Sequence, residues 1–175
     1  TPDSILLVSG PPMTGKYRLM LELLAETTDQ VIFVSTKNQA DQLASEFRTV
    51  AGDVPDDHIG VVDCVSHHET VGGQTETSTI KFATSPENLT RIGVKFTELF
   101  ETFDARPGPG HTGVGIHSLS QLLMYADVKK VYQFLQVLIG QIRGAGWFGV
   151  AVVDESVVDD EQLDTLQHHF DGIVQ

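Results

Sequence analysis

The hydrophobic positions of the chain fall into two kinds of segment that alternate along the sequence. Six short runs are rich in Val and Ile and carry charge only near their ends, a pattern typical of strands buried on both faces of a sheet. These runs cover residues 4–9, 31–35, 59–64, 113–117, 148–153 and 172–174. We therefore expect six strands with helices on both sides of them.

The segments between these runs show helical periodicity. Apolar residues recur at the spacing of an amphipathic helix in 40–47, 89–103, 131–142 and 163–170, and a helical pattern also follows the first run directly. Ser85 and Pro86 suit the cap and first turn of one of these helices, and Asp127 suits the start of the next. Strict alternation of strands and helices predicts an α/β fold, a three-layer sandwich with a mostly parallel sheet. The length of 175 residues fits a single domain over 1–175.

The composition narrows the class of protein. Acidic residues outnumber basic ones 24 to 11, for a formal net charge of −13, and 14 of the acids are Asp while only six of the bases are Lys. Such a surface repels nucleic-acid backbones and anionic lipid, and it is typical of proteins that live in concentrated salt, where charge repulsion is screened. One cysteine, Cys64, excludes an internal disulfide and suits a reducing cytosol. We expect a halophilic, cytoplasmic protein that binds neither nucleic acid nor membrane.

A phosphate-binding loop follows the first hydrophobic run. Residues 10–17 read Gly-Pro-Pro-Met-Thr-Gly-Lys-Tyr, which fits the G-x-x-x-x-G-K pattern between a strand and a helix. Backbone N–H groups around Gly15 and the helix N-terminus form a nest for an anion, and Lys16 adds a positive charge. The Ser or Thr that ends the usual motif is Tyr17 here, and a phenol oxygen lies too far from the backbone for the same magnesium position. The predicted nucleotide-binding residues are Gly10, Met13, Thr14, Gly15, Lys16, Tyr17 and His117.

Two further segments resemble a known family. Residues 114–120, Val-Gly-Ile-His-Ser-Leu-Ser, resemble the hydrophobic strand followed by Asp-Ser-Leu of the RecA superfamily of phosphate-loop ATPases, in its KaiC- and RadA-like branch. Residues 170–174, Phe-Asp-Gly-Ile-Val, resemble that family's late strand, and the acidic composition resembles its degenerate haloarchaeal, HTR-like members. The resemblance implies a RecA-like sheet with strand order 3-2-4-5-1-6, counting the six runs along the chain. It also implies ATP or ADP as the ligand.

The residues that the resemblance would make catalytic are mostly replaced. The family's magnesium-facing aspartate falls on His117, and its catalytic glutamate falls in the segment Thr36–Asn38, which holds no carboxylate. Tyr17 replaces the family's hydroxyl ligand, so that only Lys16 remains of the four parts. Phosphoryl transfer depends on metal charge and an oriented water, and we therefore expect hydrolysis to be lost or very weak.

One motif instead favours hydrolysis. Residues 150–155, Val-Ala-Val-Val-Asp-Glu, form a hydrophobic strand followed by Asp-Glu, the arrangement with which many other phosphate-loop ATPases hold magnesium and activate water. If this strand lies beside the first one, Asp154 and Glu155 approach the mouth of the loop and become candidate catalytic residues. The ordinary explanation is that two acids of an acid-rich chain begin a turn.

Three functions remain open on the sequence. The first is a nucleotide-binding module with regulatory or partner-binding activity, in signalling or regulation, and with lost hydrolysis. The second is a slow, magnesium-dependent ATPase that uses Asp154 and Glu155. The third is a protein-interaction scaffold without a ligand, whose partner is another protein or a second copy of the chain.

No metal site is predicted from the histidines, because adjacent His pairs point in different directions and chelate poorly. The role of the polar stretch 65–84 stays open.

Overall fold

A single sheet with helices on both faces organises the molecule. The computed structural model describes residues 4–11, 13–66, 76–83, 85–106 and 110–175. The strands are β1 (Ile5–Gly10), β2 (Gln30–Ser35), β3 (Ile59–Asp63), β4 (Ile80–Phe82), β5 (Thr112–His117), β6 (Phe148–Asp154) and β7 (Gly172–Val174). The α-helices are α1 (Lys16–Thr27), α2 (Ala40–Ala51), α3 (Leu89–Asp104), α4 (Leu119–Tyr125), α5 (Val128–Gly144) and α6 (Asp160–Gln167).

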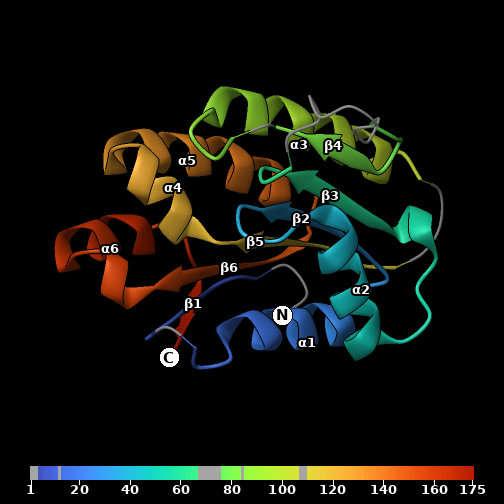
Figure 1. Cartoon of the computed structure of the whole chain (residues 1–175), viewed down its shortest axis with the longest axis horizontal. Coiled ribbons are helices and arrows are strands. Elements are labelled where there is room, and N and C mark those ends of the chain that lie inside the picture. Colours follow the sequence, from blue (N-terminus) through green and yellow to red (C-terminus); the bar gives the residue numbers. More distant parts are fainter. Residues whose placement is uncertain (1–3, 12, 67–75, 84, 107–109) are drawn as a thin grey trace.

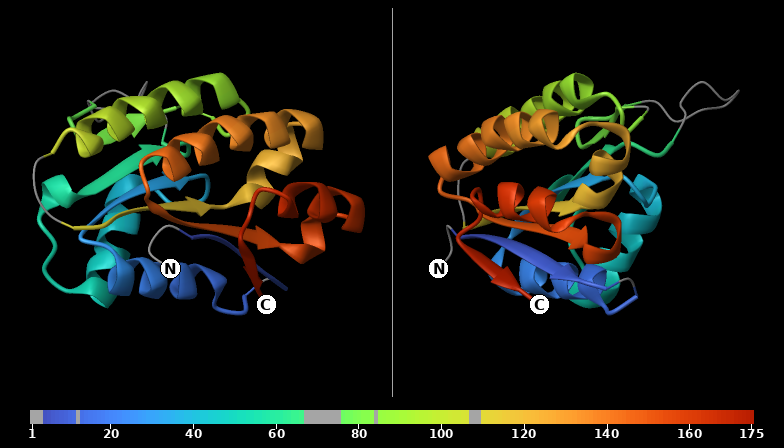
Figure 2. Two further views of the ribbon diagram at one scale, coloured as in Figure 1. Left: turned by 180° about the vertical axis from the view of Figure 1, so that it is seen from behind. Right: turned by 90° about the vertical axis from the view of Figure 1, so that its left-hand side faces the viewer.

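All strands of the sheet are parallel and follow the order β4-β3-β2-β5-β6-β1-β7. Helices α1 and α2 cover one face, while α3, α4, α5 and α6 lie on the other side, so that three layers result (Figure 1). The two further views in Figure 2 show the same separation of the helices by the sheet. The expected three-layer α/β sandwich is confirmed.

Alternating side chains along each strand supply two separate cores. In β2, Val31 and Phe33 pack beneath α1 and α2, whereas Ile32 and Val34 face the α3 and α5 side, and all four are fully buried. This period of two is the reason why an uninterrupted apolar run suits a strand that is covered on both faces. The same alternation runs through β6, where Val150 and Val152 belong to the first core and Ala151 and Val153 to the second.

Glycines in β5 let α1 approach the middle of the sheet. A Cβ atom built on Gly115 would lie 2.9 Å from the side chains of Leu24 and Phe33, and one on Gly113 would lie 2.8 Å from Leu24. The missing side chains therefore leave the space that Leu24 of α1 occupies. Because α1 begins at the phosphate loop, this close packing also fixes the position of the loop over the strand ends.

The six expected strands occur within one residue of their expected bounds, and they lie in the expected order. The sheet differs in detail because a seventh strand, β4, pairs with β3 at the edge. It lies in the stretch 65–84 that the sequence analysis left without an element, of which 67–75 and 84 are outside the described residues.

Two helix predictions need correction. Helix α3 begins at Leu89 with Asn88 as its cap, where the Asn88 side chain accepts a hydrogen bond from the N–H of Arg91, and it does not begin at Ser85 and Pro86. Helix α4 was not expected at all. Asp127 caps α5 as predicted, through a hydrogen bond from the N–H of Lys130. Within the described ranges, none of the helices has the length and apolar character that crossing a bilayer requires.

Candidate functional site

The phosphate loop joins the end of β1 to the start of α1. Gly15 stands at the N-cap of α1 with φ 84°, in the left-handed region that glycine adopts without steric cost. Helix α1 begins directly after this residue, and Gly15 and Lys16 both line the cavity described below. The Thr14 hydroxyl donates to the carbonyl of Pro11 at 2.7 Å, and the Lys16 ammonium donates to the same carbonyl. Met13 has a fully exposed side chain and φ 61°. The loop thus retains the strand–turn–helix geometry that its sequence predicts, with Pro12 outside the described residues.

A cavity of about 210 Å³ opens beside this loop, at the carboxyl ends of the central strands. Gly10 pairs with Asp154 of β6 across the sheet, and β6 in turn pairs with β5, which ends at His117. Parallel strands place such end residues at one edge, where open α/β sheets commonly bind ligands. The lining residues are Met13, Thr14, Gly15, Lys16, Tyr17, Lys37, His117, Ser118, Val152 and Asp154.

The Tyr17 and His117 rings form one wall of the cavity. Their centroids are 4.4 Å apart and their planes differ by 28°, so that the two rings are stacked. The Tyr17 phenol donates to Glu46 Oε1 of α2 at 3.0 Å, and the Asn38 amide donates to the same oxygen at 3.0 Å. Burial, together with the Glu46 carboxylate, raises the pKa of Tyr17 well above its usual range. The phenol is therefore neutral, and its hydroxyl group is bonded to α2.

His117 is buried, with 8% of its surface exposed. Burial, and to a smaller extent the charges of Lys37 and Lys16, lower the pKa of His117 to about 4. The imidazole is therefore neutral at physiological pH, as the charged form would lose its hydration beside two ammonium groups. Its Nδ1 atom is buried and has no hydrogen-bond partner among the described residues. A neutral ring nitrogen supplies neither the charge nor the hard oxygen that Mg²⁺ prefers.

Asp154 lies in the cavity, and Glu155 does not line it. The Asp154 carboxylate accepts hydrogen bonds from the N–H and the hydroxyl of Ser156, at 3.0 and 2.8 Å. Burial opposes ionisation, but these bonds and the charges of Lys16 and Lys37 outweigh it and lower the pKa of Asp154. The Glu155 carboxylate accepts a hydrogen bond from the Ser9 hydroxyl of β1 at 2.8 Å.

The segment Thr36–Asn38 brings a cation to the cavity where the resemblance would expect a glutamate. Thr36 is engaged with the turn after β5, since its hydroxyl lies within 2.8 Å of the Ser118 N–H and 3.1 Å of the His117 carbonyl. Asn38 is bonded to Glu46, which leaves Lys37 to line the cavity. The sequence analysis did not single out Lys37. Its place directly after a buried strand was the signal that could have found it.

The arrangement is suited to an anion more than to a metal ion. Two ammonium groups and a helix N-terminus face one carboxylate, so the cavity carries a net positive charge. The residues fit phosphate oxygens, which these groups bind well. They fit Mg²⁺ poorly. The three replaced positions bring only the neutral rings of Tyr17 and His117 and the ammonium group of Lys37 to the cavity. Asp154 is the one carboxylate among the described lining residues.

Comparison with known proteins supports the fold. The KaiC-like protein from the hyperthermophilic archaeon Pyrococcus horikoshii OT3, a crystal structure, superposes with a TM-score of 0.63 at 14% sequence identity. The superposition covers 98% of this chain and 71% of that one. No curated protein matches the sequence significantly. The RecA/KaiC-like architecture expected from residues 10–17, 114–120 and 170–174 is therefore confirmed as a fold.

At the level of sequence, one family model matches residues 3–175, which is nearly the whole chain. The chain belongs to the family described as "Family of unknown function (DUF7504)".

Proposed function

We propose that this protein is a nucleotide-binding module of the RecA/KaiC type, which holds the phosphates of ATP or ADP with little or no hydrolysis. In this proposal the bound nucleotide regulates how the module meets a protein partner. The observation that carries it is the loop itself. The left-handed Gly15 opens the N-terminus of α1 onto a cavity that Lys16 and Lys37 make positive. A phosphate group there would meet N–H donors and two ammonium groups at once.

Weak hydrolysis is supported by the wall of the cavity that Tyr17 and His117 form. Tyr17 and His117 are stacked on each other, the phenol is bonded to Glu46, and the imidazole is neutral. Neither ring supplies an anionic oxygen to a metal ion, and no side chain of Thr36–Asn38 can act as a general base toward water. Transfer of a phosphoryl group relies on both contributions.

Nucleotide binding can be measured by isothermal titration calorimetry with ATP and with ADP, each with and without Mg²⁺, in concentrated KCl. We expect both nucleotides to bind, and we expect Lys16→Ala to weaken binding by about tenfold or more, since a hydrogen bond to a charged group is worth about 1.5–3 kcal/mol. Lys129→Ala removes the same charge from an exposed position at the start of α5 and serves as the matched control. Absence of binding under every condition would contradict the proposal and favour a scaffold without ligand.

A slow ATPase is the second candidate, and the placement of Asp154 favours it. Asp154 lies opposite Gly10 in the sheet and lines the same cavity as Lys16, with a lowered pKa. This candidate predicts Mg²⁺-dependent phosphate release that Asp154→Asn and Glu155→Gln both abolish. Turnover that survives both substitutions, or that needs no Mg²⁺, excludes these two residues as the catalytic pair.

A further inference from the structure

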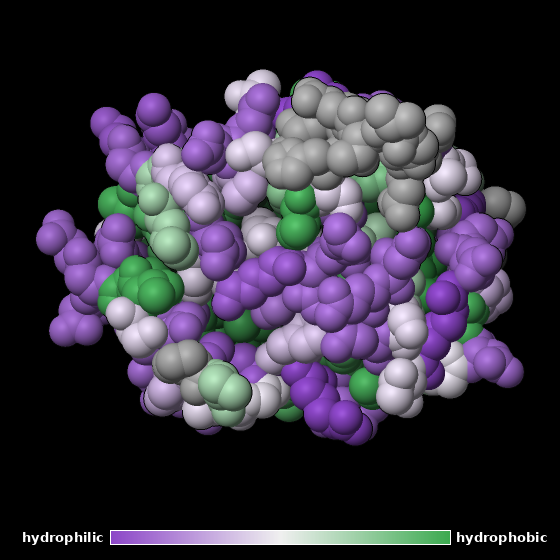
Figure 3. All heavy atoms as spheres, viewed as in Figure 1, coloured by the Kyte–Doolittle hydropathy of each residue, from purple (hydrophilic) through white to green (hydrophobic). Residues whose placement is uncertain are grey.

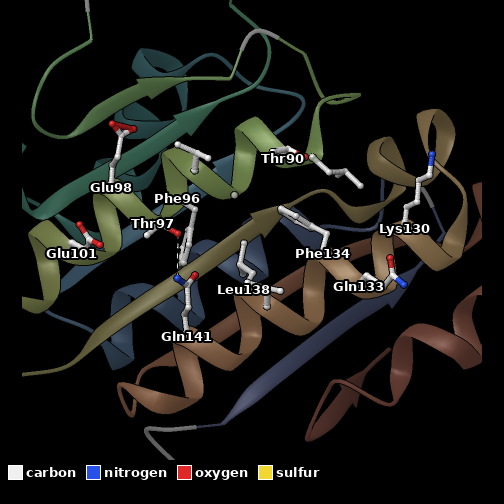
Figure 4. A pocket seen from close by; sticks show the side chains of 14 residues that line it. Thr90, Phe96, Thr97, Glu98, Glu101, Lys130, Gln133, Phe134, Leu138 and Gln141 are labelled. Carbon is white, nitrogen blue, oxygen red and sulfur yellow. Dashed lines mark hydrogen bonds between the residues drawn. The ribbon is translucent and has the colours of Figure 1, made fainter.

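A second and larger cavity lies on the outer side of the helical layer opposite α1, away from the phosphate loop. It has a volume of about 690 Å³, against about 210 Å³ for the cavity at the loop, and it is a groove between α3 and α5. Phe96 and Leu138 form its buried floor, and the Phe134 ring closes it from α5 (Figure 4). The groove shares no lining residue with the cavity at the phosphate loop.

Each of the two helices carries an exposed valine at the groove. Val94 on α3 is 55% exposed and Val137 on α5 is 67% exposed. Gly93 also lies in the lining of the groove, and a Cβ atom there would be in ordinary contact with the Phe134 ring, at 3.9 Å. Exposed apolar side chains gathered around a hollow mark a surface that gains free energy when it is covered.

The two ends of the groove carry opposite charge. Glu98 and Glu101 lie at the end formed by the C-terminal half of α3, and Lys130 lies at the other end, beside Thr90 (Figure 4). Lys130 and Glu101 form no ion pair within the described part of the chain, whereas Glu98 lies 3.4 Å from Lys95. The hydrogen bond from Gln141 to Thr97, at 3.1 Å, ties the two helices together near the acidic end. An occupant must therefore be apolar along its middle and oppositely charged at its two ends.

We infer that the α3–α5 groove is a docking site for an amphipathic helix of a partner protein, with basic residues at the end that meets Glu101 and an acidic residue at the end that meets Lys130. From Leu89 to Glu101 the groove follows α3 for about 18 Å, at the rise of 1.5 Å per residue, which is the length of about three helical turns. Helix-in-groove recognition uses apolar anchors on one stripe of such a helix. The charge on the ends then sets its direction.

A second copy of this chain fits the groove less well. The two-fold arrangement that pairs Lys130 of one copy with Glu101 of the other places a hollow against a hollow, and the space over Phe96 and Phe134 stays unfilled. A single helix instead supplies a ridge of side chains, which is how helices normally pack into a groove.

Two synthetic helical peptides of about three to four turns test the inference by fluorescence anisotropy with the full chain. Both carry Leu at the i, i+3, i+4 and i+7 positions. The first has Lys at one end and Glu at the other, and the second has Glu at both ends. We expect the first peptide to bind, the second to bind about tenfold more weakly, and Val137→Asp to weaken binding of the first about tenfold, because it buries a charge.

Val157→Asp is the matched control, since Val157 is also an exposed valine and lies outside the groove; it should leave binding unchanged. Glu101→Lys should reverse the preference between the two peptides while nucleotide binding stays as in the wild type. The inference is overturned if the first peptide does not bind, if its binding ignores Val137→Asp or Glu101→Lys, or if the wild type forms a dimer that Val137→Asp dissociates.

Discussion

Two aromatic side chains change the chemistry that the loop can perform. Tyr17 stands at the first turn of α1, and His117 stands at the end of β5, where the family resemblance would place a hydroxyl and a carboxylate. The two rings are stacked on each other and present no charge to that wall. Lys16 and the left-handed Gly15 are unaffected by this exchange. In the proposed function, binding and cleavage of phosphate therefore depend on different residues of one site, and the second can be lost while the first remains.

The buried imidazole predicts a loss of stability on acidification. The pKa of His117 is about 4 in the folded chain, against an ordinary value of 6.5. Between these two values the unfolded chain binds a proton that the folded chain does not, so the free energy of unfolding falls as pH decreases from about 6.5 to about 4. The difference amounts to about 3 kcal/mol at the lower limit. Urea unfolding measured across this range should show the loss.

The contribution of His117 can be isolated by substitution. His117→Asn removes the titrating group and should flatten the pH dependence in this range, whereas His111→Asn, at an exposed position, should leave it as in the wild type. The lowered pKa of His169 acts in the same direction and is present in both variants. An unchanged profile in His117→Asn would mean that the imidazole is protonated or hydrated in the folded chain.

The residues of the loop are easier to locate in the sequence than the residues around it. Lys16, Gly15 and Asp154 follow from a motif or from a strand end, which are local properties of the chain. The hydrogen bond between Tyr17 and Glu46 joins α1 to α2, and it depends on how the two helices pack. Lys37 was overlooked because the resemblance directs attention to a missing glutamate in the same segment. A contact between two helices, such as that between Tyr17 and Glu46, has no signature in the spacing of residues.

At the level of elements, the glycines of β5 should control how closely α1 packs on the sheet. Gly115→Ala places a Cβ atom within 2.9 Å of Leu24 and Phe33, both fully buried, and we expect a loss of about 1–3 kcal/mol of stability from overpacking. Gly140→Ala is the matched substitution in α5, where nothing lies within 4 Å of the added atom. It should stabilise the chain by about 0.5–1 kcal/mol through helix propensity.

The two variants are compared by their denaturant unfolding curves. A shift of the midpoint reports a change in stability when the slope of the unfolding free energy against denaturant concentration is unchanged. Opposite shifts are expected for Gly115→Ala and Gly140→Ala. Equal shifts would show that α1 moves away from β5 at little cost, and that the position of the phosphate loop is not fixed by this packing.

The elements predicted from the sequence are those with a clear apolar pattern. Five of the six expected strands are mostly buried, and burial on both faces leaves an uninterrupted signal, whereas the three-residue β7 is only partly buried. Strand β4 carries Lys81 at its centre and is only partly buried, which hides its apolar pattern, and α4 has seven residues, too few for a helical period to stand out. The start of α3 was misplaced because Ser85 and Asn88 are both good caps, and in the structure the Ser85 hydroxyl accepts a hydrogen bond from the N–H of Glu87 in a turn while Asn88 caps the helix.

Considered as a whole, the molecule separates its two candidate binding surfaces. The phosphate loop lies at the strand ends beside α1, and the α3–α5 groove lies on the outer side of the opposite layer. The face shown in Figure 3 is largely hydrophilic, with apolar side chains in scattered patches. The net charge of −13 carried by the whole chain has a physical consequence of its own.

This consequence is a dependence of stability on salt. A net charge of −13 on 175 residues disfavours the compact state through repulsion, which added salt screens by shortening the Debye length from about 10 Å at 0.1 M to about 3 Å at 1 M. We expect the Tm at neutral pH to rise by several degrees when KCl is increased over this range. Near pH 4.7, the isoelectric point of the sequence, the carboxylates are partly protonated and the rise should nearly vanish. A rise of equal size at both pH values would point to a general effect of salt on apolar burial, and the acidic surface would then have no part in it.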